Sequence, residues 1–77
     1  MIQIGLLWYD NSAQDLSQKL ARAIQRYQAR FGAQPNVCYV HPTAMPEGEP
    51  KVRGLRVAPS ANILRHHFWL GQEQKTG

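Results

Sequence analysis

The stretch SAQDLSQKLARAIQRYQARFG, residues 12–32, decides the fold of this chain. Its apolar residues recur four, seven, eight, eleven and fifteen positions after Leu16, and this spacing gathers them into one stripe on a helix. Ser12 followed by Asp15 is similar to a capping box, and Gly32 with Pro35 behind it supplies a stop. The sequence therefore predicts an amphipathic helix that starts at Ser12 and whose apolar stripe consists of Leu16, Leu20, Ala23, Ile24, Tyr27 and Phe31.

Short β-prone segments flank this helix on both sides. Residues 1–9 (MIQIGLLWY) are apolar at most positions, which is typical of a strand buried on both faces in the middle of a sheet. Residues 36–40 (NVCYV) follow the helix, so a parallel right-handed crossover is the economical connection between these two strands. Residues 51–58 (KVRGLRVA) predict a third strand, and residues 62–71 (NILRHHFWLG) predict a fourth strand antiparallel to the third. Residues 41–50 (HPTAMPEGEP) predict a surface loop with one helical turn near residues 43–45.

These segments add up to a single small α+β domain over residues 1–71, of βαβββ order. One amphipathic helix is expected to pack on a mixed four-stranded sheet. Residues 72–77 are predicted to be a flexible C-terminal tail. A chain of 77 residues suffices for one domain, which buries about 60% of the surface of its extended chain.

The composition bounds the class of protein. The chain is 43% hydrophobic and 18% charged, as in a globular domain rather than a disordered one. Its lone cysteine cannot form an internal disulfide, which favours a reducing compartment, and we expect the cytoplasm. No apolar stretch approaches the length that spans a bilayer, so we expect no membrane partner.

The first and last predicted strands carry large apolar residues on both faces. One helix can cover only one side of a sheet, so the other side must be covered by the proline-rich loop, by a second subunit or by a ligand. Aromatic surface that is left open usually marks an interface. We therefore expect a non-catalytic interaction module, a homodimer or an accessory subunit of a partner protein, whose interface consists of Leu7, Tyr9, Tyr39, His67 and Trp69.

The positive charge allows a second interpretation. The formal net charge is +4, and several basic side chains rise along one side of the predicted helix. Such a ridge could follow phosphates while sheet aromatics stack on unpaired bases of single-stranded nucleic acid or RNA. Solvated faces that keep a small domain in solution would give the same pattern, and no RNP-type consensus is present. The nucleic-acid alternative would use Lys19, Arg22, Arg26, Arg30 and Arg65.

Few residues offer chemistry. Cys38 and His41 have the spacing of half a zinc site, but closed sites normally need two such pairs. We therefore predict no metal, no cofactor and no catalytic residue, and we interpret Cys38 as a small buried hydrophobic residue. His66 is expected in the core, whereas His67 lies either in the core or on the open face.

Overall fold

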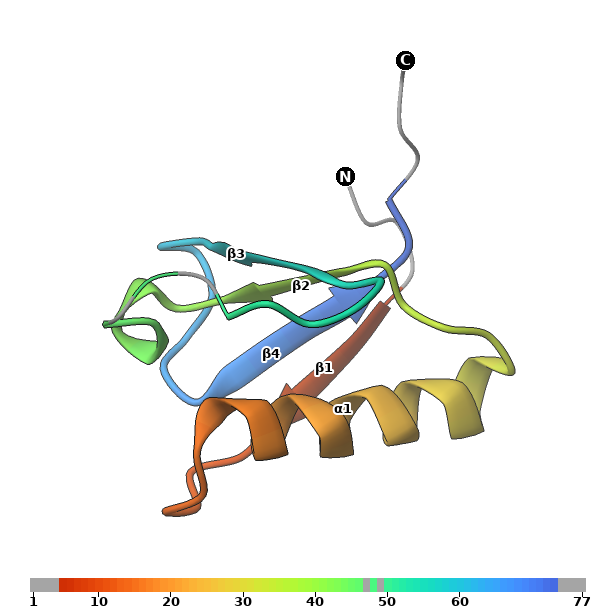
Figure 1. The fold of residues 1–77 in the computed structure, drawn as a ribbon, viewed down its shortest axis with the longest axis horizontal. Coiled ribbons are helices and arrows are strands. Elements are labelled where there is room, and N and C mark those ends of the chain that lie inside the picture. The colour runs from red at the N-terminus through yellow and green to blue at the C-terminus, as the bar shows by residue number, and fades with distance from the viewer. Residues whose placement is uncertain (1–4, 47, 49, 74–77) are drawn as a thin grey trace.

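The computed structural model of the protein describes residues 5–46, 48 and 50–73. One α-helix and a mixed four-stranded sheet form a compact α+β fold (Figure 1), which confirms the predicted fold class. The elements in chain order are β1 (Gly5–Tyr9), α1 (Leu16–Phe31), β2 (Val37–Val40), the short 3-10 helix η1 (Pro42–Ala44), β3 (Arg56–Pro59) and β4 (His67–Gly71).

The order of the strands in the sheet is β1-β4-β2-β3. β4 pairs antiparallel with both β1 and β2, and β2 pairs parallel with β3. β1 and β2 therefore run parallel, as expected, but the last strand is inserted between them. Two expectations are wrong: β1 lies at the edge of the sheet rather than in its middle, and β4 pairs with β2 rather than with β3. The physical reason is that β4 contributes Phe68 and Leu70, which are 2% and 0% exposed, and a central position buries such side chains best.

The last two strands are shorter than predicted. Residues 52–55 form a tight turn closed by a bridge between Val52 and Leu55, because Gly54 adopts a φ of 76° that favours glycine. Residues 61–66 form turns, and the backbone of His66 has a φ of 67° immediately before β4 begins. Of the first predicted strand, residues 1–4 lie outside the described residues.

The helix is capped at both ends. The carboxylate of Asp15 accepts a hydrogen bond of 2.9 Å from the backbone N–H of Gln18, so the N-cap is Asp15 and the predicted start at Ser12 is wrong. The Ser12 backbone N–H instead donates to Asp10, at 2.9 Å, in the preceding loop. At the other end Gly32 takes the left-handed conformation with a φ of 68°, as its role as a stop requires.

The core lies between α1 and the face of the sheet turned toward it. Leu20, Ala23 and Tyr27 of the predicted stripe are buried there. The rest of the stripe packs at the border of this core, which confirms the stripe. From the sheet the buried side chains are Cys38, Val40, Val57, Phe68 and Leu70.

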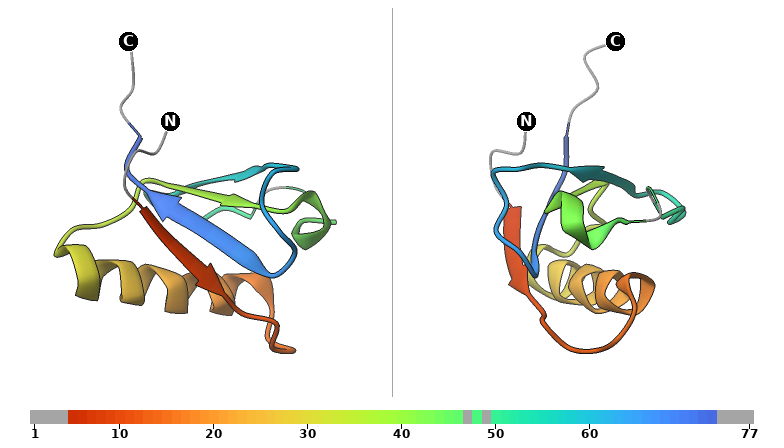
Figure 2. Two further views of the ribbon diagram at one scale, coloured as in Figure 1. Left: turned by 180° about the vertical axis from the view of Figure 1, so that it is seen from behind. Right: turned by 90° about the vertical axis from the view of Figure 1, so that its left-hand side faces the viewer.

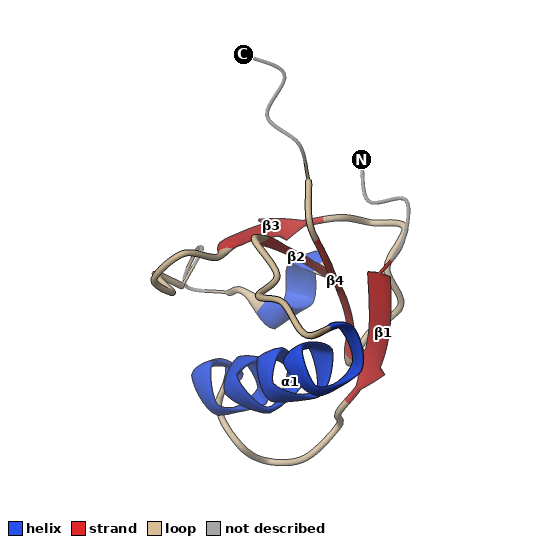
Figure 3. Ribbon diagram, turned by 90° about the vertical axis from the view of Figure 1, so that its right-hand side faces the viewer, coloured by secondary structure: helices blue, strands red, loops and turns tan. Residues whose placement is uncertain are grey.

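The proline-rich segment extends the helix-side layer. η1 lies on the same side of the sheet as α1 (Figures 2 and 3), and Ala44, Met45 and Val52 pack against the core cluster. η1 also agrees with the helical turn predicted near residues 43–45. Among the described residues, this segment therefore extends the core on the α1 side of the sheet, while on the opposite face Leu7 and Tyr9 are exposed and Val37 and Ala58 are buried.

Candidate interaction surface on the open sheet face

The five predicted interface residues lie together on the face of the sheet that points away from α1. We call Leu7, Tyr9, Tyr39, His67 and Trp69 the open sheet face. Strand register makes them neighbours: Leu7 lies opposite Trp69, Trp69 lies opposite Tyr39, and Tyr9 lies opposite His67. Side chains that alternate along a strand share one face, so three strands contribute to one continuous surface.

This surface is apolar and partly solvent-exposed. Leu7 is 58% exposed and Tyr9 is 53% exposed, while the other three residues are partly buried. The rings of Tyr9 and His67 pack at a centroid distance of 4.9 Å. The Nδ1 atom of His67 lies 3.0 Å from the carbonyl oxygen of Arg65, which can only accept, so Nδ1 carries the hydrogen. These contacts fix the rings before any partner binds, which lowers the entropy cost of association.

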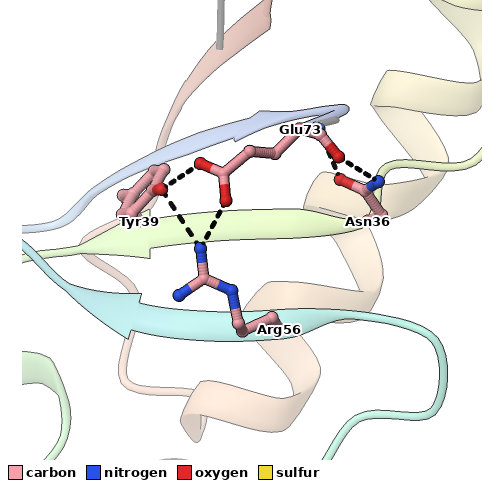
Figure 4. A network of polar contacts seen from close by, with 4 residues as sticks. All are labelled: Asn36, Tyr39, Arg56 and Glu73. Carbon is pink, nitrogen blue, oxygen red and sulfur yellow. Dashed lines mark hydrogen bonds and ion pairs between the residues drawn. The ribbon is translucent and has the colours of Figure 1, made fainter. Parts of the chain in front are cut away.

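A polar network closes one end of the open sheet face (Figure 4). The carboxylate of Glu73 accepts a hydrogen bond from the Tyr39 hydroxyl and forms an ion pair of 2.6 Å with Arg56. The Arg56 guanidinium also donates to the Tyr39 hydroxyl at 3.3 Å. The Glu73 backbone is held by Asn36, whose side chain accepts at 2.7 Å and donates at 3.0 Å. Val37, which points to this side of the sheet, is 1% exposed where the network crosses β2.

The network also removes charge from this end of the surface. The hydroxyl of Tyr39, and then the guanidinium of Arg56, lower the pKa of Glu73 because both stabilise its carboxylate. The same carboxylate raises the pKa of Tyr39 and keeps that phenol neutral. The opposite charges of Arg56 and Glu73 cancel, so the ring of Tyr39 is flanked by a neutral pair.

Sequence reasoning missed this network. Glu73 falls in the segment predicted as a flexible tail, residues 72–77, of which residues 74–77 lie outside the described part of the chain. Gln72 and Glu73 are described, and both are tied back to the domain, Gln72 by a bond of 2.9 Å to the carbonyl oxygen of Gln34. Glu73 is 34 positions away from Tyr39, so no local pattern could have paired them.

The predicted basic residues divide into two groups. Arg22, Arg26 and Arg30 are exposed on α1, in the layer opposite the open sheet face, and the Arg26 guanidinium lies 5.6 Å from the ring centroid of Trp8. Lys19 and Arg65 come from distant parts of the chain but line one cavity. The helix ridge and the sheet aromatics therefore do not share one surface.

The candidate chemical residues lie apart. The thiol of Cys38 is 0% exposed within the core, and burial raises its pKa to about 12. His41 caps η1, where its ring accepts a hydrogen bond of 3.1 Å from the backbone of Thr43. His66 is exposed rather than in the core, because the chain turns at this residue before the alternation of β4 begins. Within the described ranges, no three His, Cys, Asp or Glu side chains gather as a metal ion would require.

The fold and this surface define a small α+β domain with one open aromatic sheet face. Comparison with protein-family models, with curated proteins and with solved structures finds no match. Over the described part of the chain, no helix has the length and apolar character needed to cross a membrane.

Proposed function

We propose that this protein is a non-catalytic interaction module that forms a homodimer through the open sheet face, and that it acts in the cytoplasm. The observation that carries this proposal is the adjacency of five large side chains on the one face that neither α1 nor the proline-rich segment covers. Exposed aromatic and aliphatic surface of this kind is stabilised when a partner removes it from water.

A second copy of the chain is the partner that this surface fits best. In a dimer with two-fold symmetry the same patch meets itself, so the patch must be free of unbalanced charge at its centre. The row Leu7, Trp69 and Tyr39 meets this requirement, because none of these three side chains carries a charge at neutral pH. Sheets pack face to face at about 10 Å, a distance that side chains of this size fill.

Light scattering on the purified chain tests the proposal. We expect a mass near twice the 8.8 kDa of the chain at micromolar concentrations, and Leu7→Glu should return it to the monomer by placing a charge in the contact. Leu64→Glu is the matched control, because Leu64 is 71% exposed and lies between β3 and β4, outside the open sheet face. A wild-type mass of 8.8 kDa up to near-millimolar concentration would refute the proposal.

Nucleic-acid binding stays the alternative. Its test is the affinity for a fluorescent single-stranded oligonucleotide at low salt, which should fall steeply as salt rises. Loss of that binding in Arg22→Ala and Arg26→Ala, with dimerisation unchanged, would favour the helix ridge as the functional surface.

A further inference from the structure

A cavity of about 260 Å³ lies where the start of α1, the turn of η1 and the residues before β4 meet. Its floor is apolar and consists of Leu16, Ala44 and Phe68. Its polar walls come from segments far apart in the sequence: Gln14, Lys19, Thr43, Arg65, His66 and His67. Small-molecule sites are concave and bring polar groups together over an apolar base, and in this cavity the polar residues outnumber the apolar ones.

The charge of the lining is entirely positive. Lys19 and Arg65 bring positive charge to the lining, the His66 ring offers an N–H donor, and no Asp or Glu of the described residues lines the cavity. The pKa of Asp10 is lowered by hydrogen bonds from Ser12 and, to a smaller extent, by the positive charges of Lys19 and Arg22, so Asp10 balances part of the charge of Lys19. Asp10 accepts a hydrogen bond from Ser12, at 2.9 Å, and Asp15 caps the helix at Gln18. The lining is therefore complementary to an anion rather than to a cation.

The backbone around the cavity is held in an uncommon conformation. Among the described non-glycine residues, His66 alone has a positive φ, 67°. A turn bond of 3.1 Å from the His67 N–H to the Leu64 carbonyl fixes this conformation. Histidine is one of the residues that adopts this conformation in turns, and backbone held in this way is also found at ligand sites. Here the conformation places Arg65, His66 and His67 on one cavity wall.

One buried polar atom in the lining lacks a partner. The side-chain carbonyl oxygen of Gln14 is buried and has no hydrogen bond within the described residues. A buried acceptor without a donor is costly, and a shift of the Gln14 side chain toward the cavity would let a ligand hydroxyl donate to it. Singly protonated phosphate and a phosphorylated sugar both carry such a hydroxyl beside oxygens that accept from Lys and Arg.

We propose that this cavity binds a phosphate group, as inorganic phosphate or as the phosphate of a small phosphomonoester. Lys19 and Arg65 supply the charge-assisted hydrogen bonds, and the His66 ring completes the site. The volume is just below the 300 to 1,000 Å³ typical of small-molecule sites, so a phosphate with a small substituent fits. The proposal does not depend on self-association through the open sheet face.

Titration of the isotope-labelled full chain followed by amide NMR tests this proposal, with inorganic phosphate and ribose 5-phosphate as probes at constant ionic strength. We expect saturable shifts confined to residues around the cavity. Lys19→Gln and Arg65→Gln should each weaken binding about tenfold or more, because each removes a hydrogen bond to a charged group. The amide spectrum of each variant also reports whether it is folded.

Arg53→Gln is the matched control, because it removes the same charge from an exposed turn outside the cavity. Tighter binding of ribose 5-phosphate than of inorganic phosphate identifies a phosphomonoester, and the reverse order identifies the free anion. Shifts that do not saturate, or an equal loss in Arg53→Gln, would overturn the proposal. Tighter binding of a single-stranded oligonucleotide than of either probe would overturn the assignment to a small molecule.

Discussion

Replacing Cys38 by serine tests whether the core is as dry as its packing indicates. The thiol is 0% exposed. Cys38 lies on β2, opposite Leu70 of β4 on one side and opposite Val57 of β3 on the other. Serine is close to cysteine in shape, but its hydroxyl requires a hydrogen bond that a thiol does not. The substitution therefore changes polarity with little change in volume.

The expected cost follows from the surroundings of the sulfur atom. The Cys38 thiol donates to the carbonyl oxygen of Tyr39 over 4.0 Å, a distance that a sulfur atom can span and a hydroxyl oxygen at the same place cannot. A buried hydroxyl without a partner costs about 1 to 3 kcal/mol in protein mutants. Cys38→Ala loses packing contacts, about 1 kcal/mol by analogy with other single-group deletions. A domain of 77 residues has a total stability of about 4 to 12 kcal/mol, so both losses are measurable.

Urea denaturation monitored by tryptophan fluorescence gives the free energies of unfolding of wild type, Cys38→Ala and Cys38→Ser. We expect serine to be the less stable of the two variants. A serine variant as stable as the alanine variant would show that this position is hydrated or finds a partner, and the argument for a dry core would fail.

Further predictions concern the caps, the thiol and the polar network. Asp15→Ala should lower the free energy of unfolding by about 1 kcal/mol, whereas Ser12→Ala should have a smaller effect; equal urea midpoints would contradict the assigned N-cap. Gly32→Ala should lower the free energy of unfolding by about 1 kcal/mol in the same assay, because a side chain is disfavoured at a φ of 68°. No atom lies within 4 Å of an added Cβ, so steric contact adds nothing, and an unchanged urea midpoint would argue against the left-handed cap. Cys38 in the folded protein should be alkylated at least about 10³-fold more slowly than in the protein unfolded by urea. A pKa of about 12 in the folded state instead of 9.0 reduces the fraction of thiolate by that factor, and rapid labelling of the folded protein would disprove its burial. Folding lowers the pKa of Glu73, so the carboxylate stabilises the fold fully above its ordinary pKa of 4.5, and this stabilisation is lost as pH falls through the lowered pKa. Glu73→Gln should therefore make the free energy of unfolding depend less on pH on the acid side. An unchanged slope in pH-dependent melting would refute this.

Local patterns predicted the elements well where one physical signal dominates. The apolar stripe of α1 and the stop at Gly32 follow from spacing and backbone freedom alone, and both are confirmed. The N-cap was misplaced because Ser12 and Asp15 are both good capping residues, and only geometry decides between them.

The order of the strands could not be predicted from local sequence. β1 and β4 are both apolar on two faces, so either could have been the central strand. The structure selects β4, whose Phe68 and Leu70 are more completely buried than the partly exposed residues of β1. Positive φ values at Gly54 and His66 shorten two predicted strands, and only the glycine gave a sequence signal.

The candidate surface was predictable and its surroundings were not. Alternation places Leu7 with Tyr9 on one face of β1 and His67 with Trp69 on one face of β4, and the observed register then joins the two pairs into the open sheet face. The network of Tyr39, Arg56 and Glu73 joins residues distant in sequence, and so does the cavity lined by Lys19 and Arg65. Sites of this kind depend on tertiary contacts that composition and periodicity do not encode.

The position of β4 between β1 and β2 has a consequence for synthesis in the cell. β4 follows β1, β2 and β3 along the chain, so β1 and β2 have no shared partner until residues 67–71 emerge from the ribosome. Until then the nascent chain carries strands whose backbone groups are unpaired, which exposes it to association with other chains. Folding must then close contacts between β1 and β4, which are far apart in the sequence, so we expect a single cooperative step once residues 67–71 have emerged rather than gradual folding as the earlier elements appear.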